Sequence, residues 1–307
     1  MTNQTVLITG AGGFIGSWVT RKLYEKYKVI AVVSPFSKSS RLDDIKNKIT
    51  IIKTDLADFK TVDAIIKKVK PFAICHLATH GVYTYQQEDV DRIVIDNYLM
   101  TSNLLSSSVK YGVKKFINTG SVFEYGSQKR KVKESDVNLD DILNKYSAVK
   151  MATTALTNSY SDKLNVITLR PFTTFGPDED PTRFVRATID RALKNDPIRL
   201  VKNVIRDFVY VSDVADAFIK CVNKNFVSGE IVSIASGKKS TLDIVAKLIK
   251  KITKSKSEII FDKSYVRKKE SACWADITRA KKVLNWIPKH TLLQGIKKMV
   301  YSLEDDK

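Results

Sequence analysis

A run of glycines directly after the first apolar segment places the strongest constraint on the fold of this chain. Residues 6–9 are short and β-prone, the glycine-rich segment 10–16 follows at once, and apolar residues then recur with helical spacing over 14–27. Gly10 would permit a tight turn, Gly13 would let a pyrophosphate approach the backbone, and Gly16 would let helix and strand pack closely. The helix N-terminus would offer N–H groups and a positive dipole to phosphates. The alternative is a structural turn without a ligand. We predict a dinucleotide-binding loop formed by Gly10, Gly12, Gly13, Phe14, Ile15 and Gly16.

The next 150 residues alternate short apolar runs with segments of helical periodicity. Strands are predicted at 29–33, 49–53, 72–77, 115–119 and 165–170, and helices at 58–69, 90–111 and 146–161. This alternation predicts an α/β fold, a Rossmann-type doubly wound parallel sheet that binds ligands beyond the carboxyl ends of its strands. After Pro171 the loops lengthen and prolines become frequent. We therefore expect residues 1–170 to form a dinucleotide-binding domain and residues 171–307 a smaller C-terminal α/β substrate lobe, with the chain crossing between them.

Charge and composition narrow the partners. The 52 Lys and Arg residues outnumber the 33 Asp and Glu residues, which gives a formal net charge of +19. A basic surface attracts nucleic acid, but these lysines are spread along the chain without an arginine-rich arm, RNA-stacking motif or zinc finger. We expect a solvated lysine-rich surface and no nucleic-acid partner. No run of about 18 apolar residues predicts a membrane span, and the N-terminus does not resemble a leader peptide, so a cytoplasmic location is expected. Three scattered cysteines predict free thiols and no metal site.

Three polar residues form a candidate catalytic set. Tyr146 and Lys150 are four residues apart on a predicted helix and would share one face. An ammonium favours phenolate and lowers the pKa of a neighbouring phenol, which would make Tyr146 an acid/base near neutral pH. Ser121 follows the predicted strand 115–119, where its hydroxyl could hydrogen-bond the oxygen being reduced or oxidised. Alone, the Tyr146–Lys150 spacing would be equally compatible with an exposed helix pair.

Taken together, these segments and several others resemble the extended short-chain dehydrogenase/reductase family, in its nucleotide-sugar branch of epimerases, 4,6-dehydratases and ketoreductases. The other segments are residues 75–78 (CHLA), 170–177 (RPFTTFGP), 206–215 (RDFVYVSDVA), 274–276 (WAD) and 284–288 (LNWIP), and the likeness covers essentially the whole chain. The resemblance implies that Tyr146 is the catalytic acid/base. It also implies that Lys150 binds the nicotinamide ribose and that Ser121 holds the substrate oxygen.

The same resemblance implies further ligand contacts. On the cofactor side, Asp55 and Leu56 would meet the adenine, Leu77 and Ala78 would line the cofactor, and a buried Asn97 would contribute a polar contact. On the substrate side, the diphosphate of a nucleoside-diphosphate sugar would contact Arg206 and Arg267. The other predicted substrate contacts are His80, Tyr83 and Thr173.

Some residues have plainer interpretations. His76 is expected to be a packed histidine at a strand end, and Asp213 and Asp276 could cap helices. Leu99, Leu104 and Leu105 would serve the core or a dimer contact. The family pairs its two long helices, here 90–111 and 146–161, across a homodimer, so the resemblance implies one here.

One departure from the family pattern concerns the cofactor. Relatives that prefer NAD carry an acidic residue just after the second strand, which accepts hydrogen bonds from the adenosine ribose. Here that place is taken by Ser34, and Lys38 and Arg41 follow. Loss of a carboxylate and gain of cations suit a 2′-phosphate. We therefore favour NADP(H) as the cofactor and keep NAD as possible.

A second departure concerns the reaction. The family's 4,6-dehydratases place acidic residues directly after the catalytic hydroxyl residue, whereas this chain has Val122 and Phe123, with Glu124 one position late. Neither Val nor Phe can transfer a proton, so dehydration is disfavoured. Residues 76–83, 120–126 and 176–182 are locally similar to CDP-abequose and CDP-paratose synthase-type ketoreductases. We expect a reductase that converts a 4-keto sugar nucleotide with NADPH. An NAD-dependent nucleotide-sugar 4-epimerase, or a non-catalytic dinucleotide- or RNA-binding member, is the alternative.

Overall fold

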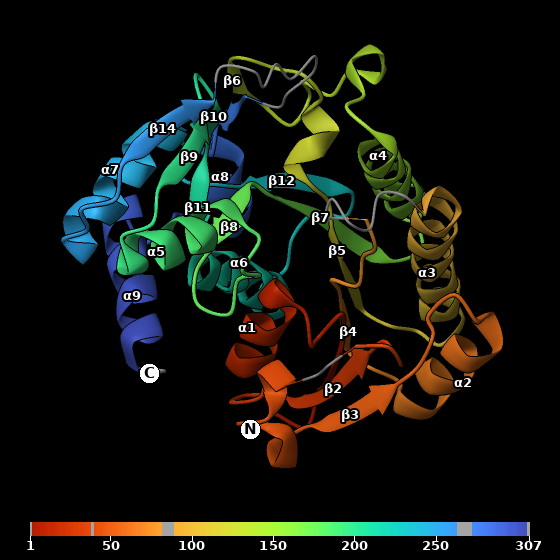
Figure 1. The fold of residues 1–307 in the computed structure, drawn as a ribbon. Coiled ribbons are helices and arrows are strands. Elements are labelled where there is room, and N and C mark those ends of the chain that lie inside the picture. The colour runs from red at the N-terminus through yellow and green to blue at the C-terminus, as the bar shows by residue number, and fades with distance from the viewer. Residues whose placement is uncertain (1, 38–39, 82–88, 263–271, 306–307) are drawn as a thin grey trace.

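A computed structural model describes residues 2–37, 40–81, 89–262 and 272–305 of this chain. Seven parallel strands form the central sheet in the order β12-β7-β5-β4-β1-β2-β3 (Figure 1). This confirms the predicted α/β, Rossmann-type doubly wound sheet. The strands are β1 (Thr5–Thr9), β2 (Lys28–Val33), β3 (Thr50–Lys53), β4 (Ala73–His76), β5 (Lys115–Thr119), β7 (Asn165–Pro171) and β12 (Glu230–Ile234).

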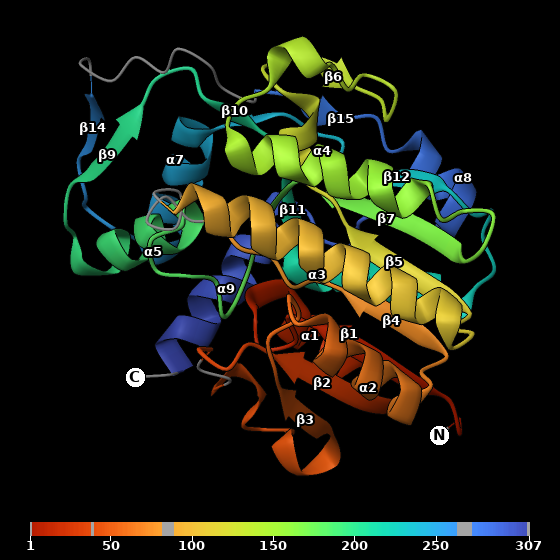
Figure 2. The ribbon, with the colours of Figure 1, turned by 90° about the vertical axis from the view of Figure 1, so that its right-hand side faces the viewer.

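Helices cover both faces of this sheet because its strands are apolar on both sides. Along β1, Val6 and Ile8 enter one hydrophobic core and Leu7 enters the other, as the alternation of side chains along a strand requires. The first core packs against α1 (Phe14–Leu23) and α6 (Val211–Asn223). The second packs against α2 (Phe59–Val69), α3 (Val90–Lys110) and α4 (Lys145–Asn158), which lie side by side in front of the sheet in Figure 2.

The C-terminal residues build a second lobe with its own core. Phe175, Ile189, Ile249 and Met299 are buried together there, away from the sheet. Its short strands pair in twos, with β9 beside β14, β8 beside β11 and β10 beside β13. The elements of this lobe are β8 (Thr173–Phe175), α5 (Phe184–Lys194), β9 (Ile198–Val201), β10 (Ile205–Arg206), β11 (Phe208–Tyr210), β13 (Ser240–Thr241), α7 (Leu242–Thr253), β14 (Ile259–Asp262) and α9 (Leu292–Asp305).

The chain crosses between the two parts. Helix α6 returns to pack beside α1, and β12 then pairs in parallel with β7 as the edge strand of the central sheet. Helix α8 (Thr278–Leu284) packs beside β12, and β15 (Trp274–Ala275) pairs with β6 (Lys131–Val132). Residues on both sides of the expected boundary at 170/171 therefore contribute to one sheet.

Three features of the described residues bear on membrane, metal and redox functions. Among the described residues, no helix is long and apolar enough to cross a bilayer. The same residues contain no group of three or more His, Cys, Asp or Glu side chains arranged to hold a metal ion. The thiols of Cys75, Cys221 and Cys273 are all buried within the described chain, and none of them forms a disulfide there.

Candidate active site

A single continuous cleft of about 1530 Å³ joins the central sheet to the second lobe. It opens beyond the carboxyl ends of β1 to β5, where ligands of doubly wound sheets bind. The glycine loop, Ser34, Arg41 and Asp55 line one end, Ser121 and Tyr146 line the middle, and Thr173 and Arg206 line the other end. One cavity can therefore hold a dinucleotide and a second ligand in contact.

The glycine loop fits a pyrophosphate for steric reasons. Gly10 has a φ of +65°, and a Cβ atom there would lie 2.6 Å from the backbone nitrogen of Ala78. A Cβ on Gly16 would collide with the carbonyl oxygen of Gly10. Gly13 caps α1 without a side chain, so the N–H groups of the first turn face the cleft with the positive end of the helix dipole. The backbone thus offers the donors that a dinucleotide requires.

The predicted catalytic residues meet in the middle of the cleft. Tyr146 and Lys150 lie one turn apart on α4, and Ser121 follows the end of β5. The Lys150 Nζ atom donates to the Thr119 carbonyl at 2.8 Å and lies 5.9 Å from the centre of the Tyr146 ring. The hydroxyls of Ser121 and Thr79 act on the Tyr146 phenol and lower its pKa. A hydroxyl, a phenol and an ammonium therefore converge at one point of the cleft wall.

Burial controls the protonation of this group. It raises the pKa of Tyr146 to about 12; hydrogen bonds from Thr79 and Ser121 oppose this rise, while the charge of Glu124 adds to it. Burial also lowers the pKa of Lys150 to about 8, against the charge of Glu124. The expectation of a lowered phenol pKa is therefore wrong for this structure, because desolvation of the phenolate outweighs the groups that lower the pKa. At neutral pH the phenol is protonated and Lys150 is an ammonium.

Most predicted cofactor contacts line the cleft. Ser34, Leu56, Leu77 and Ala78 do so, as does Asp55, whose carboxylate accepts from the Ala57 amide at 2.9 Å. Arg41 also lines it and donates to the carbonyls of Gly12 at 3.3 Å and Asp178 at 3.0 Å. Lys38, Tyr83 and Arg267, which the sequence also implicated, lie outside the described residues.

Asn97 is buried beside the cleft and does not line it. Its Oδ1 atom accepts from the Thr79 hydroxyl and the His80 amide, both at 2.9 Å, and its Nδ2 atom donates to the His80 carbonyl at 2.9 Å. The amide thus holds the Thr79–His80 loop, and both loop residues line the cleft. In this structure the polar task of Asn97 is to position that loop.

The contacts of His76 and Asp276 agree with their plainer interpretations, whereas Asp213 does not cap a helix as expected. The ring of His76 is held between the hydroxyls of Thr9 and Thr101, and burial lowers its pKa to about 3. Asp276 caps α8 by accepting from the Thr278 amide at 2.9 Å. Asp213 accepts from the His290 amide and ring, so it ties α6 to the segment before α9.

The substrate end of the cleft is lined by Thr173, His80 and Arg206, together with residues that the sequence did not single out. Glu179 is buried there, one of its carboxylate oxygens has no hydrogen-bond partner among the described residues, and burial raises its pKa to about 8. Glu179 lies within residues 176–182, whose local similarity to ketoreductases was noted in the sequence, but its burial against the cleft could not be read from that pattern. Arg183, Arg191 and Arg199 also line this end.

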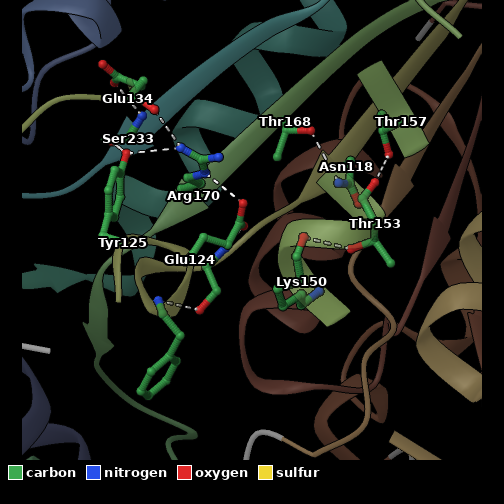
Figure 3. Close-up of polar contacts among 12 residues, drawn as sticks. Asn118, Glu124, Tyr125, Glu134, Lys150, Thr153, Thr157, Thr168, Arg170 and Ser233 are labelled. Atoms are coloured by element: carbon green, nitrogen blue, oxygen red, sulfur yellow. Dashed lines mark hydrogen bonds and ion pairs between the residues drawn. The ribbon is translucent and has the colours of Figure 1, made fainter. Parts of the chain in front are cut away.

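Glu124 is closed off from the cleft. Its Oε1 atom accepts from the Ser121 amide at 2.7 Å, and its Oε2 atom accepts from the Arg170 guanidinium at 2.9 Å (Figure 3). The two residues that do face the cleft at this point are Val122 and Phe123. The acid/base pair that a 4,6-dehydratase places here is therefore replaced by apolar side chains.

Known proteins resemble this chain over nearly its full length. The UDP-glucuronate 4-epimerase of Thermodesulfobacterium geofontis is 28% identical over 96% of this chain and 94% of its own length. The CDP-abequose synthase of Salmonella muenchen is 26% identical over 97% of each chain. The crystal structure of the Thermotoga maritima UDP-glucose 4-epimerase with UDP-glucose superimposes with a TM-score of 0.87, at 27% identity and 99% coverage of both chains. Residues 6–235 match the NAD dependent epimerase/dehydratase family, and the chain belongs to that family.

Proposed function

We propose that this protein is an NAD-dependent nucleotide-sugar 4-epimerase. The observation that carries the proposal is the convergence of Ser121, Tyr146 and Lys150 in a cleft that joins the glycine loop to the second lobe. The sequence alone favoured a 4-ketoreductase. The relatives that act as 4-epimerases, and a family described as NAD dependent, support the epimerase instead.

The residues of the cleft suit proton transfer at carbon 4 of a sugar. Tyr146 takes the proton of the 4-hydroxyl when the sugar is oxidised and returns it when the ketone is reduced. Lys150 stabilises the phenolate that Tyr146 must form, and Ser121 hydrogen-bonds the same substrate oxygen. A bound nicotinamide cofactor would supply the acceptor and donor of the hydride. Because burial holds the phenol protonated, the ammonium of Lys150 is essential for the oxidative half.

The far end of the cleft suits a diphosphate. Arg183, Arg191, Arg199 and Arg206 all line it, and guanidinium groups bind phosphate oxygens through paired hydrogen bonds. Asp207, the residue after Arg206, accepts hydrogen bonds from the amides of Ser236, Gly237 and Ala275. These bonds fix the backbone beside Arg206. We therefore expect a nucleoside-diphosphate sugar as the substrate.

A 4-ketoreductase is the second candidate, and three observations favour it. Ser34 lines the cofactor end in place of a carboxylate, with Arg41 nearby, which suits the 2′-phosphate of NADPH. The relative from Salmonella muenchen is a CDP-abequose synthase. A buried, protonated Tyr146 is also the form that donates a proton to a ketone.

Cofactor content and turnover distinguish the two candidates. The purified protein is denatured, and the released dinucleotide is identified and quantified. Stoichiometric NAD together with interconversion of UDP-sugars would support the epimerase. A protein without bound dinucleotide that oxidises added NADPH only with 4-keto nucleotide-sugars would replace it with the reductase. Neither activity across a panel of UDP-, CDP-, GDP- and dTDP-sugars would contradict both.

The outer face of α3 supports a homodimer. Val94, Ile95, Tyr98 and Leu99 are 44%, 50%, 41% and 39% exposed, whereas Leu104 and Leu105 are buried in the core. Helix α4 runs alongside α3, as Figure 2 shows, so the two helices form one surface. We propose that two copies pair through these helices, because exposed apolar patches of this kind mark interfaces. A cytoplasmic location and the absence of a nucleic-acid partner stay predictions.

A further inference from the structure

A buried ion pair lies directly behind the catalytic serine. Glu124 and Arg170 are almost fully excluded from solvent, and the Arg170 Nε atom donates to the Glu124 Oε2 atom at 2.9 Å. The Arg170 Nη1 atom also donates to the Glu134 carbonyl at 3.1 Å (Figure 3). These contacts lock the guanidinium between β7 and the loop after β5. An enclosed ion pair costs solvation energy, so a specific task is the simplest reason to keep it.

The carboxylate reaches the catalytic residue through its backbone. The Glu124 Oε1 atom accepts from the Ser121 amide at 2.7 Å, and the Ser121 hydroxyl accepts in turn from the Phe123 amide at 3.2 Å. A Cβ on Gly120 would collide with the same carboxylate oxygen. The turn that carries Ser121 is therefore fitted closely around the Glu124 side chain, and Ser121 cannot shift without breaking these bonds.

The charge of Glu124 also acts on both titrating groups. Burial raises the pKa of Glu124, while Arg170, the Ser121 amide, Thr154 and Lys150 act to lower it. Arg170 is a permanent cation, and it donates to the carboxylate, which favours the ionised form. The negative charge raises the pKa of Tyr146 and of Lys150. Across the cleft, the charged group that faces Tyr146 is Arg183, which acts in the opposite direction.

We propose that Glu124, held by Arg170, is a positioning residue of the active site that fixes Ser121 through its amide and places a negative charge beside the part of α4 that carries Tyr146 and Lys150. The inference rests on the proposed function, since it assigns roles within the same site. It also assigns Glu124 a role that differs from the proton transfer expected of the acidic residues near this position in 4,6-dehydratases.

The test compares pH profiles of kcat for three variants. Glu124→Gln keeps an acceptor for the Ser121 amide and removes the charge. Because both protons are then lost more easily, the limb of the profile set by Tyr146 should move to lower pH by about one unit. The neutral amide oxygen of Gln holds the Ser121 amide more weakly than a carboxylate does, so kcat should also fall, by about 10- to 100-fold, with KM little changed. Glu134→Gln is the matched control, since Glu134 contacts Arg170 and Ser233 but not Ser121; its profile should match wild type.

A buried, unpaired Arg170 could prevent Glu124→Gln from folding. The double variant Glu124→Gln/Arg170→Gln removes both charges and is expected to show the same limb shift. A folded single or double variant with the wild-type pH profile would overturn the inference, and so would an equal shift in Glu134→Gln. Wild-type turnover is measured first. An inactive wild type would contradict the proposed function itself, whereas an active wild type with unshifted variants would contradict only the role of Glu124.

Discussion

Tyr146 is subject to two opposing demands at the scale of the single residue. Burial holds its phenol protonated, with a pKa raised to about 12, while the oxidation of an alcohol requires the phenolate. The nearby Lys150 ammonium and the Ser121 hydroxyl are the groups that can make the phenolate accessible. The protonation of Tyr146 therefore depends on the few groups next to it, not on the net positive charge of the protein.

Replacing Tyr146 by Phe should lower kcat by about 100-fold or more, because the proton donor and acceptor is lost while the ring still packs. The melting temperature should stay near that of wild type, as measured by circular dichroism. Tyr160→Phe is the matched control, since the Tyr160 hydroxyl bonds Ser106 outside the cleft. Unchanged turnover in Tyr146→Phe would remove this residue from the mechanism.

Glu179 should make stability depend on pH. Its pKa is raised from 4.5 to about 8 by burial, so the folded protein holds a proton that the unfolded chain loses near pH 4.5. The free energy of unfolding should therefore fall between about pH 4.5 and 8, by up to ~1.4 kcal/mol per pH unit from this group. Glu179→Gln should flatten this part of the profile in urea titrations at several pH values. Glu25→Gln removes the same charge from an exposed site and is the control; equal slopes in Glu179→Gln and wild type would contradict the assignment.

At the scale of elements, a buried lysine at the start of β5 ties the central sheet to the end of helix α6. Lys115 opens β5, and its Nζ atom donates to the carbonyls of Cys221 at 3.3 Å, Val222 at 2.9 Å and Lys224 at 2.6 Å. These carbonyls end α6, where a cation also meets the negative end of the helix dipole. Lys115 thus binds the end of α6, although the two are 106 residues apart in the sequence.

Lys115→Met should destabilise the protein by about 2–4 kcal/mol, because three partly buried carbonyls lose their donor. Thermal unfolding followed by circular dichroism measures the effect. The neighbouring Lys114→Met, at an exposed position, should leave the melting temperature almost unchanged. Equal melting temperatures for the two variants would show that the buried ammonium contributes little to α6.

At the scale of the whole molecule, the cleft exists because the chain crosses between its two parts. Helix α6 packs on the central sheet and strand β12 is its edge strand, while the segments before and after them build the second lobe. Each crossing passes beside the carboxyl edge of the sheet, so the second lobe faces the glycine loop (Figure 1). The exposed face of α3 lies on another side of the molecule and is available to a second copy.

Ile95→Asp should convert the proposed homodimer to monomers, because a carboxylate would be buried at the centre of the α3 surface. Sedimentation equilibrium should then report the 34.6 kDa mass of one chain instead of twice that mass. Val227→Asp, an exposed apolar site away from α3, should leave the dimer intact. A monomeric wild-type protein would contradict the pairing.

The sequence by itself determined what neighbouring residues encode. The strand–loop–helix with its glycines, the alternation of strands and helices, and the separation of Tyr146 from Lys150 by one helical turn all depend on local sterics and periodicity. Local pattern also placed Ser121 at the end of a strand. The periodicity predicted a helix over residues 14–27, but α1 ends at Leu23 because β2 begins at Lys28.

Only the tertiary structure decided what depends on distant contacts and on exclusion of water. The pairing of Glu124 with Arg170 joins residues 46 positions apart, and the use of the Asn97 amide on the Thr79–His80 loop joins α3 to a different strand end. The direction of the Tyr146 pKa shift follows from burial by several elements at once. No local pattern specifies desolvation, because it is a property of the packed chain.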